Sequence, residues 1–284
     1  MRVKNIFNKI AIKKGAHMEM SGTVKSRFSF RYLRKFNGWM AVMHFILAII
    51  MLVAGLSIDK IAAFKLPFTV SFLAYDPVKA ALVSETKNIG SLPIGAFVSI
   101  FLFVSALAHF LTTLPKVNNF YNSRLSMGIN YFRWFEYSIS SSVMIVILSM
   151  LFGVYDLGSI ILIIGCNATM NHLGLQMEIH NQTTKKTNWT AFIIGSFVGI
   201  IPWIIVLMYF LGGGNYGQIP WFVYAIVSTY FVLFNLFPVN MILQYKKTGP
   251  WKDYLYGERG YIILSLVAKS LLAWLVFAGT MQPN

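Results

Sequence analysis

Two ionisable residues, Lys269 and Glu136, stand inside long apolar stretches of the sequence. Ionisable groups within a lipid bilayer are energetically expensive and are usually functional. A lysine buried in apolar surroundings loses its proton more readily, and the neutral amine is a nucleophile that condenses with an aldehyde to form a Schiff base. The protonated form of that Schiff base needs a nearby carboxylate, which Glu136 would supply.

The composition indicates that both residues lie in a membrane. Of the 284 residues, 57% are hydrophobic and 12% are charged, whereas soluble proteins have about 45–50% apolar and about 25% charged residues. The net charge of +15 would by itself suggest a nucleic-acid partner, but nucleic-acid binders present polar surfaces. The single cysteine, Cys166, excludes an internal disulfide framework. We therefore predict an integral membrane protein with no nucleic-acid partner.

Seven segments have the length and apolar composition of a helix that spans the lipid bilayer, which needs ~20 residues. They are residues 38–57, 92–114, 130–153, 158–178, 191–211, 220–243 and 261–281. The expected fold class is an all-α membrane protein, a bundle of seven transmembrane helices. Residues 1–37 would form a basic cytoplasmic N-terminal segment and residues 38–282 the membrane domain.

The long connection between the first two spans, residues 58–91, contains the β-favouring run KLPFTVSFLAYDP, which Pro67 and Pro77 interrupt. A small β-hairpin on the membrane surface fits this segment, and so does an irregular loop.

The basic residues give the direction of the chain across the membrane. Nineteen of the 24 Lys and Arg residues fall on the side of the N-terminus, and four lie in the connection 58–91. Cytoplasmic segments carry an excess of Lys and Arg. We therefore expect a cytoplasmic N-terminus and an extracellular C-terminus, with the protein in the cell membrane.

Lys269 and Glu136 are expected to pair, because each lies six to eight residues into a span that runs in the same direction. Ser265 shares a helix face with Lys269, and Ser140 shares a face with Glu136, since each serine is four residues away. Arg133, three residues before Glu136, is a competing partner for that carboxylate, but it is expected to extend toward the cytoplasmic interface instead. The alternative is an ion pair that only fixes helix packing, and its desolvation cost weighs against it.

Two histidines, His44 and His109, reach the level of Glu136, with Ser105 one helical turn deeper than His109. These side chains predict a polar or hydrated cavity beside the carboxylate. No third ligand recurs at the spacing that a metal site requires. Seven spans with one buried lysine and one carboxylate are the minimal set for a protein that binds retinal.

The sequence resembles the heliorhodopsins. The longest matching stretches are RWFEYSISSSVMIV (133–146) and GERGYIILSLVAKSLLAW (257–274), and the resemblance covers about residues 34–282. Shorter matching stretches are SALAHF (105–110), GCNATM (165–170), IPWI (201–204) and FNLF (234–237).

The resemblance implies all-trans retinal bound to Lys269 as a protonated Schiff base, with Glu136 as its counterion. It also implies a homodimer, a β-hairpin in the first extracellular loop and the inverted membrane orientation. Glu178 matches a family carboxylate near the end of the fourth span. Further residues that the resemblance places near retinal are His44, Ser105, His109, Met170, Gly174, Trp203, Phe234 and Ser265.

Two features depart from the family pattern. The basic extension at residues 1–30 is longer than expected, and it could bind anionic lipid headgroups or include sequence upstream of a start at Met18. Asn171 and His172 are polar where apolar residues are expected, so they could tune the colour or supply protonatable groups.

The expected function is light sensing through retinal isomerisation, a slow photocycle and signalling, with no enzymatic activity. Proton pumping requires acceptor and donor groups in series, and the outer half of the bundle has no acidic residue. Two alternatives stay open, a light-gated passive proton or ion conductance and the regulation of an unidentified cytoplasmic or membrane partner.

Overall fold

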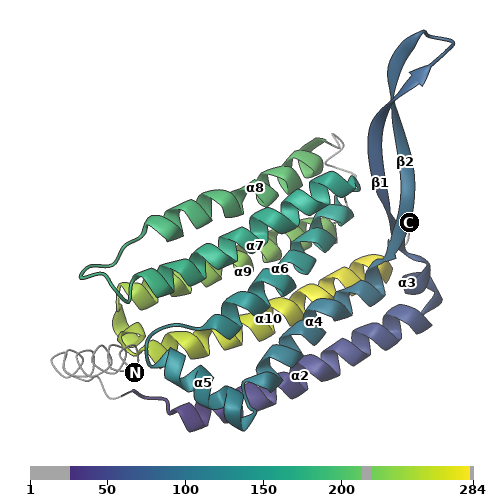
Figure 1. Cartoon of the computed structure of the whole chain (residues 1–284). Helices are drawn as coiled ribbons and strands as arrows, with labels where there is room; N and C mark the ends of the chain where they lie inside the picture. Colours follow the sequence, from purple (N-terminus) through teal and green to yellow (C-terminus); the bar gives the residue numbers. More distant parts are fainter. Residues whose placement is uncertain (1–25, 213–218, 220, 282–284) are drawn as a thin grey trace, which may run out of the picture.

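A computed structural model describes residues 26–212, 219 and 221–281, so residues 1–25 of the expected N-terminal segment lie outside the described part. Within the described residues, seven helices are long and apolar enough to cross a membrane, and they lie side by side in Figure 1. This bundle confirms the predicted fold class. The seven helices are α2 (Phe30–Ser57), α4 (Ile94–Leu111), α6 (Tyr131–Leu151), α7 (Leu157–His180), α8 (Thr190–Gly212), α9 (Trp221–Tyr245) and α10 (Tyr254–Met281).

The first and last spans begin earlier than the hydropathy predicted, because capping residues rather than apolar composition set the helix ends. Helix α2 begins at Phe30, where the side chain of Ser29 accepts a hydrogen bond from the Tyr32 backbone N–H at 3.1 Å. Helix α10 begins at Tyr254, where Asp253 accepts from the Leu255 N–H at 3.0 Å. Both helices therefore extend about two turns further in the N-terminal direction.

Three short elements in the connections were not predicted. Helix α3 (Asp59–Ala63) precedes the first strand, and the 3-10 helix η2 (Gly249–Lys252) precedes α10. Helix α5 (Pro115–Leu125) joins α4 to the loop before α6 and has a proline in its first turn, where no N–H is needed. Its polar sequence lacks the long apolar run by which the spans were found.

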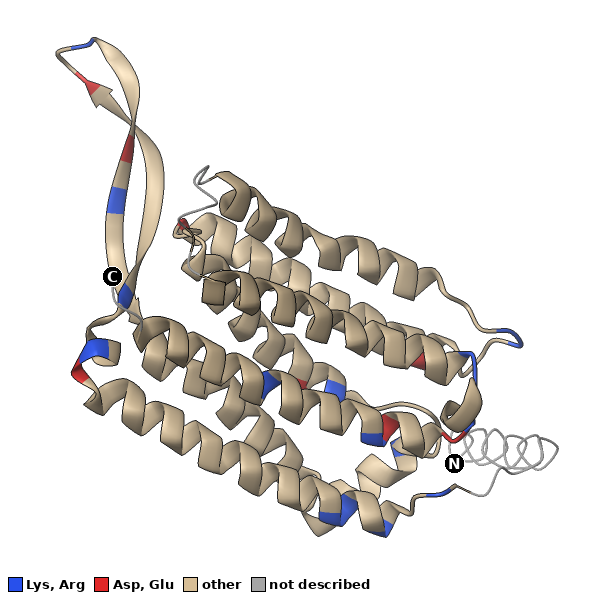
Figure 2. Ribbon diagram, turned by 180° about the vertical axis from the view of Figure 1, so that it is seen from behind, with Lys and Arg blue, Asp and Glu red and all other residues tan. Residues whose placement is uncertain are grey.

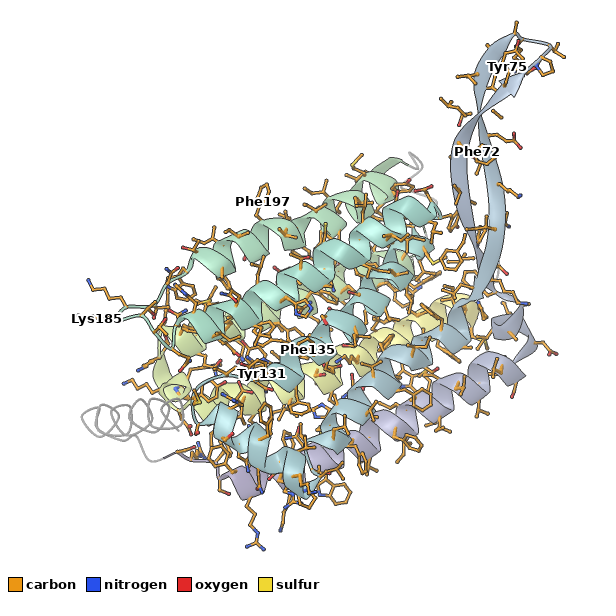
Figure 3. All side chains as sticks on the ribbon, viewed as in Figure 1. Phe72, Tyr75, Tyr131, Phe135, Lys185 and Phe197 are labelled. Carbon is orange, nitrogen blue, oxygen red and sulfur yellow. The ribbon has the colours of Figure 1, made fainter. Side chains whose placement is uncertain are left out.

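The long connection between α2 and α4 was expected to form either a β-hairpin or an irregular loop, and it forms the hairpin. Strand β1 (Lys65–Asp76) pairs antiparallel with β2 (Ala81–Pro93), with a bulge between Phe68 and Thr69. The Thr69 N–H donates to the Tyr155 carbonyl at 2.8 Å, which ties the hairpin to the loop between α6 and α7. The hairpin runs across the helix ends and its tip projects beyond the bundle (Figure 1), carrying the labelled Phe72 and Tyr75 (Figure 3).

The two ends of the bundle differ in charge. We call the end where α2, α6, α8 and α10 begin the basic end and the opposite one the hairpin end. Figure 2 shows many of the Lys and Arg residues at the basic end, others at the hairpin, and few charged residues along the middle of the helices. The few interior charges therefore need partners within the bundle.

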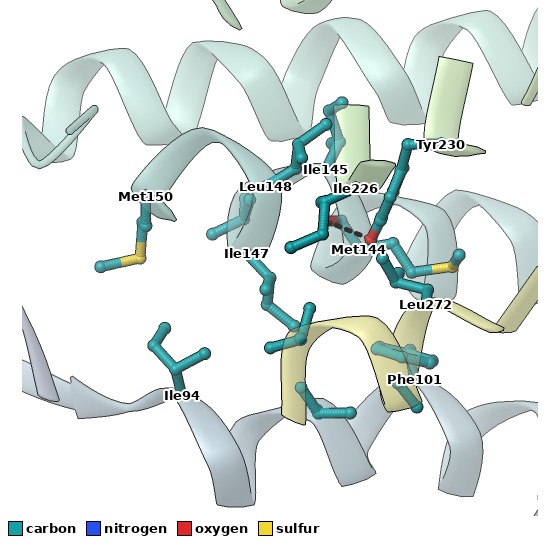
Figure 4. Close-up of a cluster of buried hydrophobic side chains, with 14 of the residues drawn as sticks. Ile94, Phe101, Met144, Ile145, Ile147, Leu148, Met150, Ile226, Tyr230 and Leu272 are labelled. Atoms are coloured by element: carbon teal, nitrogen blue, oxygen red, sulfur yellow. Dashed lines mark hydrogen bonds between the residues drawn. The ribbon is translucent and has the colours of Figure 1, made fainter. Parts of the chain in front are cut away.

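The main apolar core fills the half of the bundle toward the hairpin. Phe101, Met144 and Leu272 belong to it, and the Tyr230 hydroxyl donates to the Met144 carbonyl at 2.9 Å (Figure 4). Helices α2 and α4 approach closely at Gly55, where an added Cβ would lie 2.6 Å from the backbone nitrogen of Ala96. Polar groups gather on the other side of this core, where the candidate site lies.

Candidate functional site

The Lys269 amine and the Glu136 carboxylate meet in the interior of the bundle. Lys269 Nζ on α10 lies 2.7 Å from Glu136 Oε1 on α6, and the two side chains are 4% and 6% exposed. Two hydroxyls complete the contact, since Lys269 Nζ donates to Ser265 Oγ at 2.8 Å and Ser105 Oγ donates to Glu136 Oε1 at 2.6 Å. The pairing expected from helical spacing is present, and both charges are buried away from bulk solvent.

The two histidines lie beside this pair. The His44 and His109 rings stack with their centroids 5.5 Å apart, and His109 Nδ1 lies 2.7 Å from Asn37 Oδ1. His44 is fully buried, and neither of its ring nitrogens has a hydrogen-bond partner within the described residues. A cavity of about 40 Å³ is lined by His109, Glu136 and other polar side chains, and it is large enough for water.

A second, larger cavity of about 350 Å³ extends from Lys269 between the helices. This volume is in the range of sites that hold a small organic ligand. The residues of this cavity that the sequence predicted as site residues are Ser140, Met170, Gly174, Trp203, Phe234 and Lys269. His44, Ser105, His109 and Ser265 do not line it and lie instead around the ion pair and the smaller cavity.

The larger cavity suits an elongated apolar ligand that carries an aldehyde. Its aromatic wall includes Trp203, whose ring packs edge-on against Phe231 and Phe234 with centroids 5.3 and 5.8 Å away. Gly174 is required there, because an added Cβ would lie 2.2 Å from the Trp134 ring. The cavity therefore combines a buried amine with an aromatic, largely apolar lining, which fits retinal.

The expectation that Arg133 extends to the membrane interface is wrong. Arg133 is 6% exposed, and its guanidinium forms salt bridges with Glu178 on α7 and Glu258 on α10. Lys269 and Glu136 are therefore not the only charged residues well inside the spans. An interfacial position would leave both of these buried carboxylates without a cation, which explains why the arginine turns inward.

Glu258 was not among the predicted site residues, because α10 was expected to begin after it. Within α10 it lies seven residues before Ser265 and eleven before Lys269, so all three share one helix face. The seven-residue spacing between Glu258 and Ser265 places both on one helix face, but only if the helix includes Glu258. The expected span began at residue 261 and left Glu258 outside the helix.

The two polar residues of α7 that depart from the family pattern lie on different faces. Asn171 is buried, lines the larger cavity and donates to the Asn167 carbonyl at 2.8 Å. His172 is on the exposed face, where its ring packs edge-on against that of Phe135, 5.3 Å away; Phe135 is labelled in Figure 3. Only Asn171 can therefore contact a ligand in this cavity.

The described residues contain no group of three or more His, Cys, Asp or Glu side chains that could hold a metal ion. Outside the spans, the Tyr121 hydroxyl lines the smaller cavity, and burial raises its pKa well above the ordinary value. Tyr121 therefore stays a neutral phenol at physiological pH.

Seven membrane-crossing helices around a buried lysine–carboxylate pair, with an apolar cavity beside the lysine, are consistent with a rhodopsin bundle. The family model described as heliorhodopsin matches residues 33–281, which is most of the chain. The chain therefore belongs to the heliorhodopsin family. No curated protein sequence matches it significantly. Membership indicates a membrane-embedded, retinal-binding and light-sensing rhodopsin.

Proposed function

We propose that the protein is a light sensor in which all-trans retinal is held on Lys269 as a protonated Schiff base, with Glu136 as the counterion. The bound chromophore would supply photoisomerisation. The observation that carries the proposal is the buried 2.7 Å contact between Lys269 Nζ and Glu136 Oε1 at the wall of the 350 Å³ cavity.

The surrounding side chains support distinct roles. Ser105 donates to Glu136 Oε1, and Ser265 accepts from Lys269 Nζ, so both fix the geometry of the charge pair. Trp203 and Phe234 pack edge-on and would form part of the wall against which a polyene lies, and Gly174 leaves room for the wall that Trp134 forms. Burial of the charge pair away from bulk solvent strengthens its electrostatic interaction.

Signalling rather than pumping fits the positions of the carboxylates. The carboxylates buried within the spans are Glu136, Glu178 and Glu258, and the last two lie toward the basic end. Asp59 follows the end of α2 and Asp156 precedes the start of α7, so both acids lie at the hairpin end of the spans. A vectorial pump needs acceptor and donor groups on both sides of the Schiff base, and the described part of the hairpin half contains no buried carboxylate.

We propose that the basic end faces the cytoplasm and the hairpin faces outside, in the cell membrane. The charge distribution in the sequence and in Figure 2 supports this orientation. We also propose a homodimer that forms through α7. Thr169, His172 and Gln176 form a polar row on its exposed face, and polar side chains within a membrane span favour contact with another helix over contact with lipid.

The test is a visible absorption spectrum of the protein expressed with all-trans retinal. The wild type and Lys185→Ala should both form a visible band, because Lys185 is exposed in a loop (Figure 3). Lys269→Ala should form none, and Glu136→Gln should shift the band because the counterion charge is removed. A band that persists in Lys269→Ala would show that the chromophore is held elsewhere.

Voltage clamp under illumination separates the sensor from its alternatives. The expected result is no photocurrent. A current that reverses with voltage would establish passive conductance, and a steady outward current at zero voltage would establish pumping.

A further inference from the structure

Toward the basic end from the charge pair, five residues form a second buried ionic assembly, which we call the Arg133 cluster. Its members are Asn130, Arg133, Trp134, Glu178 and Glu258, from α6, the residue before it, α7 and α10. Arg133 pairs with one oxygen of each carboxylate. Glu178 and Glu258 are both only 1% exposed, so the cluster is closed to solvent at the basic end.

Every carboxylate oxygen in the Arg133 cluster accepts a hydrogen bond from an N–H group. Glu178 Oε2 accepts from the Asn130 backbone at 2.9 Å and from Trp134 Nε1 at 2.8 Å. Glu258 Oε2 accepts from Asn130 Nδ2 at 2.7 Å. The donor set suits two ionised carboxylates, but a single guanidinium leaves the cluster with one uncompensated negative charge.

The 40 Å³ cavity joins this cluster to the Lys269–Glu136 pair. Glu258 and Arg133 line one part of it, and Glu136 and Ser265 line another. Glu258 precedes Ser265 by seven residues, a rise of about 10 Å along the helix. Buried polar atoms on the cavity wall, Arg133 Nε and the Tyr261 hydroxyl, have no hydrogen-bond partner within the described residues. A cavity of this size with such groups fits one or more bridging waters.

We propose that Glu258 is a second proton-binding site, which receives the proton that leaves the nitrogen on Lys269 and holds it inside the protein. This inference rests on the proposed function. The N–H bond at Lys269 breaks and an O–H bond forms on Glu258, with cavity water as the relay. The Arg133 cluster then changes from a net charge of −1 to neutral, and the negative charge of Glu136 becomes the uncompensated one.

Glu258 rather than Glu178 is the acceptor because only Glu258 lines the cavity. Tyr121 also lines it but is a phenol that burial keeps neutral. The cluster's single excess negative charge favours proton uptake, since two carboxylates that share one cation repel each other. The titratable and charged groups around Glu258, on its own helix and on the neighbouring elements, are His109, Tyr121, Arg133, Tyr137, Glu178, Tyr245, Tyr254 and Tyr261.

Protonation of Glu258 would also transmit the light signal to the basic end. The Arg133–Glu258 salt bridge joins α6 to α10, the same two helices that Glu136 and Lys269 join. A neutral Glu258 binds Arg133 less strongly, whereas Arg133 keeps its pair with Glu178 on α7. The contact between α6 and α10 therefore loosens near the surface where a signalling partner would bind.

Light-minus-dark infrared difference spectroscopy tests the proposal on the retinal-loaded full chain. While the nitrogen on Lys269 lacks its proton, a carbonyl-stretch band of a newly protonated carboxylic acid should rise. The band should shift when glutamate side chains carry a ¹³C carboxyl label and should be lost in Glu258→Gln. It should persist in the control Glu85→Gln, because Glu85 is exposed on the hairpin.

The glutamate label in the wild type keeps the test valid if Glu258→Gln does not fold. The proposal is overturned if the band does not shift on labelling, or if it is lost only in Glu136 or Glu178 variants. It is also overturned if a pH dye shows that the proton is released to bulk water. If the wild type forms no visible band at all, the proposed function fails; a visible band without a Glu258 signal defeats this inference alone.

Discussion

Replacing Arg133 by glutamine should destabilise the protein strongly, because it removes the one cation shared by two buried carboxylates. Glu178 and Glu258 would keep their hydrogen bonds from Asn130 and Trp134 but lose the guanidinium. Breaking a buried ion pair by removing one partner costs about 3–5 kcal/mol. A change of 1 kcal/mol shifts Tm by about 2–4 °C in a domain of 150–250 residues, so Tm should fall by roughly 6–20 °C.

The assay is thermal unfolding of the retinal-free protein in detergent, followed by circular dichroism at neutral pH. Arg31→Gln is the matched control, because Arg31 lies exposed on α2 and its loss should change Tm little. Mildly acidic pH should narrow the gap between Arg133→Gln and the wild type, since protonation removes the unpaired charges in the variant.

A neutral triple variant supplies the decisive comparison. Arg133→Gln combined with Glu178→Gln and Glu258→Gln removes all three charges, and it should be more stable than Arg133→Gln alone. The cluster is not a closed ionic assembly if the triple variant is less stable than Arg133→Gln. The same conclusion follows if Arg133→Gln and the Arg31→Gln control have the same Tm.

Two further predictions follow from helix packing and from the faces of α7. Gly55→Ala should lower Tm by the equivalent of about 1–3 kcal/mol, because the added Cβ would lie 2.6 Å from backbone atoms of α4. Gly165→Ala is the control and should leave Tm unchanged, since nothing outside its own stretch of helix lies within 4 Å of the added Cβ. Asn171→Leu should shift the visible band of the retinal-loaded protein and leave its oligomeric state unchanged. His172→Leu should leave the band in place and lower the dimer fraction in detergent, measured by light scattering; the reverse pattern would contradict the assignment of the two faces.

Local sequence was sufficient for the features that depend on the composition of one segment. The seven spans follow from runs of apolar residues, whereas the β-favouring run in the first long connection left a hairpin and an irregular loop open. The pairing of Lys269 with Glu136 follows from depth within a span, because helical rise converts sequence position into height.

The Arg133 cluster was not predictable in the same way, because Glu258 lies before the expected start of the last span and so had no assigned depth in the bundle. An arginine near a helix end can extend to the interface or turn inward, and only the position of Glu258 decides between the two. That position depended on where α10 begins, which Asp253 sets by accepting the Leu255 N–H. The helix cap at Asp253 therefore bears on whether Arg133 is expected to turn inward or to extend to the interface.

The α6–α10 interface carries two ion pairs of opposite polarity. Helix α6 contributes the cation Arg133 and the anion Glu136, and α10 contributes the anion Glu258 and the cation Lys269. Well-packed apolar residues often stabilise a buried interface as well as an ion pair does, so stability alone gives little reason for two such pairs. Transfer of one proton from the Lys269 end to the Glu258 end would neutralise one member of each pair at the same time. The crossed arrangement thus makes both ion pairs between these helices respond to a single chemical event, which one ion pair could not do.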